Sequence, residues 1–151
     1  MSINAICYAA QIDWTAVRRP VETEIEHMLG RARRLNRLNG VTGAILLYRN
    51  HLVQWLEGER GGLVDSRECA SRDPRLSGLF SLCEGTLSER LFPHCWLYFA
   101  DYRADDAVPG GLLGQLANAP APVELSEMAD CMAEVARVLE PARFTHAAML
   151  V

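Results

Sequence analysis

The order of apolar and polar positions along the chain predicts several strands separated by helices. Residues 3–10 are apolar on both alternating faces, which is typical of a strand that is covered on both sides. Residues 41–48 and 51–57 are joined by Arg49-Asn50 and predict a hairpin. Two further runs, at 76–86 and 95–102, predict two more strands.

Helical periodicity predicts one strong helix after Pro20 that ends at Gly40, because proline favours the first position of a helix and glycine its end. A helix with a thin apolar face is expected at 62–72, and an amphipathic helix at 126–140. Residues 107–122 are rich in Gly and Pro and predict a linker with a short helix near 112–117. The apolar stripe of the strong helix recurs at spacings of three and four and consists of Val21, Ile25, Met28, Leu29, Ala32 and Leu35.

The order β-α-β-β-α-β-β predicts an α+β fold, a ferredoxin-like sandwich with both helices on one face of the sheet. The other face would carry Val53 and Trp55, which are too apolar to face water. We therefore expect the helix at 126–140 to cover that face or the surface of a partner. The chain then divides into a domain at 1–105 and a C-terminal helical extension at 106–151.

Composition and charge argue against several classes of partner. The 151 residues carry a formal net charge of −4, which disfavours nucleic acid and anionic lipid. No apolar run approaches the ~20 residues of a membrane helix, and the N-terminus lacks the features of a signal peptide, so we expect a cytoplasmic protein. The five cysteines and four histidines are scattered, which argues against a disulfide framework or a metal site. Buried structural thiols are the expected role of the cysteines, with redox sensing as the alternative.

Three polar side chains occupy positions where the pattern calls for apolar ones. Gln54 lies between Leu52 and Leu56 on one face of a strand, Asn36 continues the apolar stripe of the strong helix, and Tyr8 shares a face with Ile6. A buried amide without a partner costs about 1–3 kcal/mol, so each of these groups needs a hydrogen bond. Each could be satisfied by its own neighbours. Together they could line a slot for a flat polar ligand, with recognition or redox chemistry rather than hydrolysis.

An ordered set of motifs between about residue 3 and residue 101 resembles the BLUF domain, a bacterial flavin-binding sensor of blue light. The set covers two-thirds of the chain and is specific only as a set. It comprises Tyr8 in the first strand, the helix motif at 28–43 that contains Asn36, Leu52-Val53-Gln54-Trp55-Leu56-Glu57-Gly58, Asp73-Pro74-Arg75-Leu76, and Arg90-Leu91-Phe92-Pro93-His94 followed after Cys95 by Trp96.

The resemblance implies that a flavin, with FAD as the family expectation, lies between the two helices on the sheet. Tyr8 would be the electron and proton donor, and Gln54 would bridge Tyr8 and the flavin and rearrange after illumination. Asn36 would bond to the edge of the flavin. Trp96 would lie near the glutamine and report the change through the last strand. The remaining contacts to the ring, the ribityl chain or the phosphates would come from Arg33, Asp73 and Arg75.

Five positions depart from the family pattern. Leu76 replaces a histidine, so one hydrogen bond to the flavin is expected to be missing. Tyr98 replaces a methionine, and strand alternation would place it on the face of Trp96, where we expect it to crowd Gln54 or to act as a second electron donor. Small side chains on the second helix would weaken one wall of the pocket. The five positions are Ala10, Ser66, Ala70, Leu76 and Tyr98.

Three functions follow as hypotheses. The first is a photoreceptor that is not an enzyme, because the roughly 50 residues after the sensor are too few for a cyclase or a phosphodiesterase. Its output would pass to an unidentified protein partner or change the self-association of a homo-oligomer. The second is a flavin-free interaction module on the same fold. The third, an acylphosphatase-like hydrolase, lacks a phosphate-binding loop with Arg and Asn together, and the fold alone cannot support it.

Overall fold

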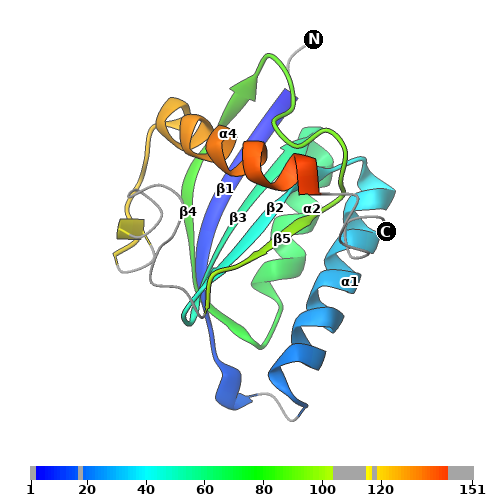
Figure 1. Ribbon diagram of the computed structural model, residues 1–151, viewed down its shortest axis with the longest axis vertical. Helices are drawn as coiled ribbons and strands as arrows, with labels where there is room; N and C mark the ends of the chain where they lie inside the picture. Colours follow the sequence, from blue (N-terminus) through cyan, green and yellow to red (C-terminus); the bar gives the residue numbers. More distant parts are fainter. Residues whose placement is uncertain (1–2, 17–18, 104–114, 117–118, 143–151) are drawn as a thin grey trace.

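A computed structural model describes residues 3–16, 19–103, 115–116 and 119–142. Its centre is a five-stranded sheet with the strand order β4-β1-β3-β2-β5 (Figure 1). Neighbouring strands are antiparallel, except that β2 and β5 are parallel. The strands are β1 (Ile3–Ile12), β2 (Thr42–Tyr48), β3 (His51–Gly58), β4 (Leu76–Leu87) and β5 (Tyr98–Asp101). The predicted ferredoxin-like α+β fold is confirmed.

Helices cover both faces of the sheet. Helices α1 (Val21–Asn39) and α2 (Arg60–Ser71) contribute Ile25, Leu29 and Leu63 to one apolar core. Helix α4 (Leu125–Ala142) crosses the opposite face, where its residues Met128 and Met132 are fully buried (Figure 1). The expected linker helix near 112–117 lies mostly outside the described residues.

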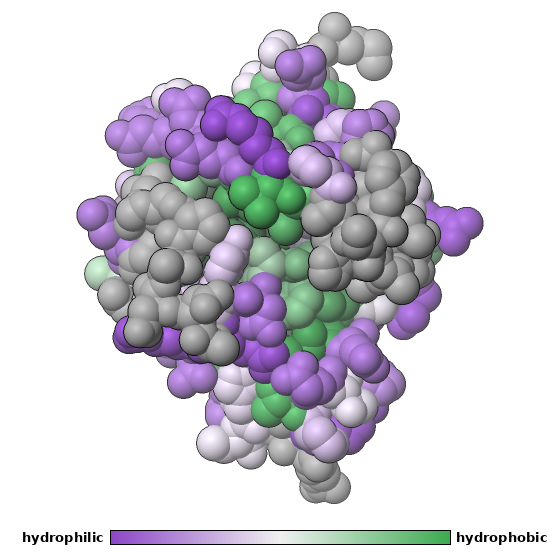
Figure 2. Space-filling model, viewed as in Figure 1, coloured by the Kyte–Doolittle hydropathy of each residue, from purple (hydrophilic) through white to green (hydrophobic). Residues whose placement is uncertain are grey.

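Alternation along β3 explains why the sheet needs both layers. Val53 and Trp55 belong to the core beneath α4, whereas Leu52 and Leu56 belong to the core beneath α1 and α2. Trp55 is completely buried, as its position on the second face predicts. In the view of Figure 2, the outer surface of α4 is mostly hydrophilic while hydrophobic residues gather beside it at the centre of the face. The helix therefore separates this apolar sheet face from water.

The long helix α1 ends where the sequence predicts. Gly40 takes a left-handed conformation with φ of 64°, and its N–H donates to the carbonyl of Arg37. Glu22 and Glu24 lie in the first turn and Arg37 in the last, an arrangement that complements the helix dipole. Within the described residues, no helix is both long enough and apolar enough to cross a bilayer.

Strand β5 begins at Tyr98, three residues later than the sequence predicts. The carbonyls of Trp96 and Leu97 are occupied by side chains of α1 instead of by a neighbouring strand. Asn36 Nδ2 donates to Trp96 O at 2.7 Å, and Arg33 Nε donates to Leu97 O at 2.9 Å. Side-chain hydrogen bonds of this kind compete with strand pairing.

Gly43 provides a test of how closely β2 and β3 approach. A Cβ atom at Gly43 would overlap the backbone oxygen of Trp55. Gly43→Ala should therefore lower the free energy of unfolding by about 2–4 kcal/mol, because the two strands would have to separate. The matched control is Gly61→Ala, where nothing lies within 4 Å of the added Cβ. Urea denaturation measures both, and equal stability of the two variants would contradict this account.

Candidate functional site

A cleft with a free volume of about 40 Å³ lies between α1 and α2 on the sheet. Its floor is formed by strands β1, β2 and β3, and its walls are mostly apolar. The wall and floor residues that make it apolar are Met28, Ala32, Leu35, Ile45, Leu52, Ala70 and Leu76. Small-molecule sites commonly have this character, with a few polar groups that fix the orientation of the ligand.

Tyr8 and Gln54 meet on the floor of the cleft. They are opposite each other in the antiparallel register of β1 and β3, and Ile45 of β2 is the next residue in the same row. The Tyr8 hydroxyl donates to Gln54 Oε1 at 2.6 Å. Tyr8 is 1% exposed and Gln54 6% exposed, so this hydrogen bond is shielded from water. Burial raises the pKa of the Tyr8 phenol far above its usual value, which keeps the proton on the hydroxyl.

The Gln54 amide has a second polar end that the described residues leave available. No described residue forms a hydrogen bond with Nε2, although the side chain lies in the cleft lining. An amide donates through nitrogen and accepts through oxygen, so Gln54 can bond to Tyr8 and to a ligand at the same time. The cleft thus presents a hydrogen-bond donor at its floor.

Asn36 links three parts of the site. Its Nδ2 donates to Trp96 O at 2.7 Å, and its Oδ1 accepts from Ser66 Oγ at 3.0 Å. Asn36 is 1% exposed, and both Asn36 and Ser66 line the cleft. The hydroxyl of Ser66 therefore ties α2 to α1.

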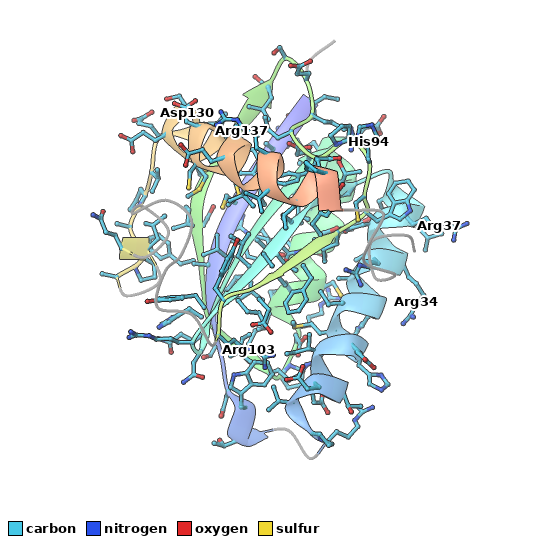
Figure 3. The ribbon with its side chains drawn as sticks, in the orientation of Figure 1. Arg34, Arg37, His94, Arg103, Asp130 and Arg137 are labelled. Carbon is cyan, nitrogen blue, oxygen red and sulfur yellow. The ribbon has the colours of Figure 1, made fainter. Side chains whose placement is uncertain are left out.

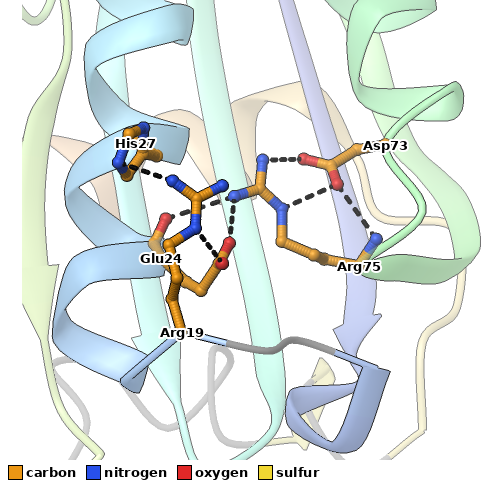
Figure 4. Close-up of polar contacts among 5 residues, drawn as sticks. All are labelled: Arg19, Glu24, His27, Asp73 and Arg75. Atoms are coloured by element: carbon orange, nitrogen blue, oxygen red, sulfur yellow. Dashed lines mark hydrogen bonds and ion pairs between the residues drawn. The ribbon is translucent and has the colours of Figure 1, made fainter.

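Asp73 and Arg75 form a closed ionic network at one end of the cleft (Figure 4). Arg75 donates from Nε and Nη2 to the two carboxylate oxygens of Asp73, each at 2.8 Å, and from Nη1 to Glu24 Oε2 at 3.0 Å. Glu24 also accepts from Arg19 at 3.0 Å. Burial alone would raise the pKa of Asp73, but the hydrogen bonds and charge of Arg75 lower it below its ordinary value. One N–H of Arg75 Nη2 is left over for a ligand.

Arg33 does not line the cleft, contrary to the sequence-based expectation. Its side chain is 5% exposed and points to the β5 side, where Nε donates to Leu97 O. Arg31 lines the cleft instead. Arg31 and Arg33 lie about 100° to either side of Ala32 around the axis of α1. Helix α2 packs on the side of Arg31.

The expected positions of Trp96 and Tyr98 are also corrected. Trp96 is half-buried, is not among the cleft-lining residues, and accepts a hydrogen bond from Asn36 through its carbonyl. Tyr98 is fully buried on the α4 side, with its ring centroid 5.8 Å from that of Phe92. It therefore does not crowd Gln54. Strand alternation failed here because the chain before Tyr98 is not a regular strand.

Sequence reasoning missed the structural role of two carboxylates. Glu24 is 6% exposed, and its spacing of four residues from Met28 was the available signal. Glu57 is fully buried, and it lies on the same face of β3 as Trp55, two residues away. Glu57 Oε1 accepts from Trp55 Nε1 at 2.9 Å, and the backbone N–H groups of residues 91 and 92 donate to its carboxylate at 2.6 and 3.0 Å. Burial raises the pKa of Glu57, while these hydrogen bonds oppose that effect.

The residues present fit an isoalloxazine ring. The cleft has mostly apolar walls, which suit the faces of an aromatic ring system. The donor at Gln54 Nε2 has no described protein partner, and the polar groups of Asn36 and Arg75 stand at the cleft boundary. Tyr8 adds an oxidisable phenol within hydrogen-bond distance of Gln54. This combination can bind a flat heterocycle and rearrange hydrogen bonds beneath it.

Comparisons with known proteins point to one family. The family model for BLUF, sensors of blue-light using FAD, matches residues 4–97. The structure of the BlsA photo-activated state is 22% identical, with a TM-score of 0.71 over 90% of this chain and 95% of that chain. The dark-state structure of the BLUF protein BlrB is 21% identical, with a TM-score of 0.72 over 91% of this chain and 98% of that chain.

A longer protein from Klebsiella pneumoniae shares the same fold. The manganese and cyclic-diGMP complex of its BlrP1 is 24% identical, with a TM-score of 0.60 over 76% of this chain and 28% of that chain. These structural likenesses show a common fold. No curated protein matches the chain.

The ionic network gives a prediction for pH. Asp73→Asn should lower the free energy of unfolding at pH 7 by about 1–2 kcal/mol, because a charge-assisted pair with Arg75 is lost. The pKa of Asp73 is lower in the folded protein, so its stabilisation is complete above the ordinary aspartate pKa of about 4 and is lost as pH falls through the lowered pKa. Urea denaturation between pH 7 and pH 3 should show the difference shrinking. The exposed Asp65→Asn is the control, and a difference that stays constant with pH would refute the assignment.

Proposed function

The chain belongs to the BLUF family of blue-light sensors that use FAD, and from this membership we propose that Tyr8 and Gln54 form its light-operated switch. BLUF domains are sensors rather than enzymes. The observation that carries the proposal is the buried hydrogen bond of 2.6 Å from Tyr8 to Gln54 Oε1, together with a Gln54 Nε2 that has no described protein partner.

The switch needs only one side-chain torsion to move. A half-turn of the terminal amide of Gln54 exchanges its oxygen and nitrogen, which occupy nearly the same volume. Oε1 then turns from Tyr8 toward the cleft, and a tautomeric change of the amide would have a similar effect on the hydrogen bonds. Two hydrogen-bond arrangements of similar energy make a bistable element, and a small bias moves the population between them.

Tyr8 is the residue we propose to give an electron and a proton after illumination. A bound flavin absorbs the blue light and supplies the redox chemistry. Burial keeps Tyr8 protonated, so the hydroxyl is a reliable donor in the dark state. The short hydrogen bond to Gln54 gives the proton a direct path to the amide oxygen. The apolar floor around Ile45 and Leu52 excludes water that would compete for both groups.

Asn36, Asp73 and Arg75 are the residues we propose to hold the polar end of the cofactor. Asn36 is fixed by Ser66 on α2 and by the carbonyl of Trp96, so its position is set before a ligand binds. Asp73 and Glu24 fix the guanidinium of Arg75, with one N–H of Arg75 still available. Leu76 lines the cleft but offers no hydrogen bond, so Arg75 and Asn36 carry more of the polar contact.

We propose that the flavin is FAD rather than riboflavin. A groove lined by Arg31, Leu38 and Arg72, together with the acidic Asp65 and Glu68, adjoins the cleft and shares Arg31, Leu35 and Cys69 with it. Arginine pairs well with phosphate oxygens, and the 83% exposed Leu38 offers an apolar surface to an adenine ring. A cofactor tail that leaves the cleft between the helices would pass these residues.

The signal is proposed to leave through residues 106–151, the C-terminal extension of the sensing domain at 1–105. Neighbours of Gln54 on β3 point to the opposite face, where Trp55 is buried beneath α4. A second route runs from Asn36 through the Trp96 carbonyl to β5. Val138 on the outer face of α4 is 62% exposed and offers a contact for a protein partner or for a second copy in a homo-oligomer.

A cytoplasmic location is proposed as well. It is supported by the five cysteines, none of which forms a disulfide, as expected for thiols in a reducing compartment. A flavin-free interaction module is not favoured, because the cleft combines apolar walls with the hydrogen-bonded Tyr8 and Gln54 on its floor.

Gln54→Leu tests the switch directly. The variant should still bind flavin, because leucine fills a similar volume, but blue light should no longer shift the flavin absorption band to longer wavelength. Absorption spectra before and after illumination make the measurement. Gln11→Leu is the matched control, since Gln11 is exposed on β1, and it should shift as the unaltered protein does.

A normal shift in Gln54→Leu would refute the role of Gln54. Tyr8→Phe removes the same hydrogen bond from the other side and should give the same loss. Tyr48→Phe, at the end of β2, is its control because Tyr48 lies outside the cleft lining.

Arg31→Ala tests the choice of cofactor. The variant should bind FAD and FMN about tenfold more weakly, the equivalent of one lost charge-assisted contact of about 1.4 kcal/mol, and should bind riboflavin unchanged. Flavin fluorescence titration measures the three affinities. Arg34→Ala is the control, because Arg34 points away from the sheet (Figure 3). Equal weakening for riboflavin, or tighter binding of riboflavin than of FAD to the unaltered protein, would contradict the assignment.

A further inference from the structure

Four cysteines, Cys95 among them, lie on the side of the sheet that the light switch does not use. Cys7 of β1, Cys83 of β4 and Cys131 of α4 belong to the apolar core beneath α4, and they are 0%, 9% and 9% exposed. Figure 3 shows sulfur atoms gathered beneath this helix. Within the described residues, no group of metal-ligating side chains is placed to hold a metal ion. Any chemistry of this cluster is therefore chemistry of its thiol groups.

Cys7 and Cys83 are opposite each other in the antiparallel register of β1 and β4. Directly opposed residues have Cβ atoms about 4.5–5.5 Å apart, and a disulfide needs about 3.5–4.5 Å, so a small movement is sufficient. Both side chains belong to the same buried cluster beneath α4. The register shifts immediately after Cys7, because Tyr8 pairs with Ser81 and Leu82 is the extra residue of a bulge. Such a bulge interrupts the regular pairing of the two strands.

We propose that Cys7 and Cys83 form a reversible disulfide across β1 and β4 when the protein meets hydrogen peroxide. The Cys83 thiolate attacks one peroxide oxygen, the O–O bond breaks, and the products are a sulfenic acid at Cys83 and hydroxide. The Cys7 sulfur then attacks the Cys83 sulfur, the S–O bond breaks, and water leaves with the Cys7 proton. In sum, two thiols lose two electrons and two protons, and peroxide is reduced to two molecules of water.

Cys83 is the thiol that reacts first. It lies on β4, the edge strand of the sheet, and retains some exposure, whereas Cys7 is completely buried. The neighbouring thiol of Cys7 lowers the pKa of Cys83, and burial raises the pKa of Cys7. Cys131 contacts neither thiol through a described hydrogen bond, although its charge acts on Cys7. Cys7 and Cys83, which are opposed across β1 and β4, are thus the favoured pair for a disulfide.

The disulfide would fix the edge strand to the strand that carries the switch. Cys7 precedes Tyr8 directly, so the disulfide would hold the backbone next to Tyr8 against β4. The disulfide would therefore join β4 to β1 on the α4 side of the sheet. It would lie outside the cleft, because neither thiol is among the cleft-lining residues.

Peptide mapping tests the proposal, because trypsin places each cysteine in a separate peptide. The full-length protein with its flavin is reduced, treated with hydrogen peroxide in the dark, unfolded in urea with iodoacetamide, and digested without reductant. We expect three of the five cysteines to be alkylated and residues 1–18 to be linked to residues 76–90. Dithiothreitol should restore all five labels.

Variants separate this pairing from others. Cys131→Ser should keep the link, whereas Cys83→Ser should abolish it and leave Cys7 alkylated. Alkylation of all five cysteines after peroxide treatment would overturn the proposal. So would a link from either peptide to residues 104–137, which contain Cys131, or a sulfinic acid at Cys83 with Cys7 still free to react.

Discussion

The buried hydrogen bond between Tyr8 and Gln54 is the interaction on which the function of this protein depends. It joins two neighbouring strands at directly opposed positions, and its surroundings are nearly dry. In such a place an amide must find partners for both its ends, because water cannot replace them. One end is bonded to Tyr8, and the side chain lines a cleft with mostly apolar walls. The ligand therefore completes a hydrogen-bond network that the fold leaves unfinished.

In the proposed function, the two faces of the sheet separate detection from output. Odd and even residues of β3 alternate between the cleft and the core beneath α4, so Gln54 and Trp55 are adjacent in the chain and opposite in space. Glu57 extends the connection, because its buried carboxylate holds the backbone at Leu91 and Phe92, in the segment that leads to β5. A change in the position of β3 would thus reach the α4 side and the last strand together.

Much of this architecture follows from the sequence. Pro20 and Gly40 bracket α1, and simple alternation places Tyr8 and Gln54 on one face and Trp55 on the other. The failures have local physical causes. Arg31 and Arg33 flank the same helix face, and only the packing of α2 decides which of them reaches the cleft. Trp96 and Tyr98 depart from alternation because side chains of α1 bind the carbonyls before β5. The burial of Glu24 was not predicted, because a carboxylate in the first turn of a helix is expected from the helix dipole alone.

The rearrangement of Gln54 can be observed directly by infrared spectroscopy. The measurement is a light-minus-dark difference spectrum of the flavin-loaded protein with ¹³C in the side-chain carbonyl of glutamine. Because the carbonyl exchanges one hydrogen-bond partner for another, we expect a label-sensitive band that shifts on illumination and returns in the dark. A difference spectrum without any label-sensitive band would show that Gln54 keeps its partners, and it would contradict the proposed switch.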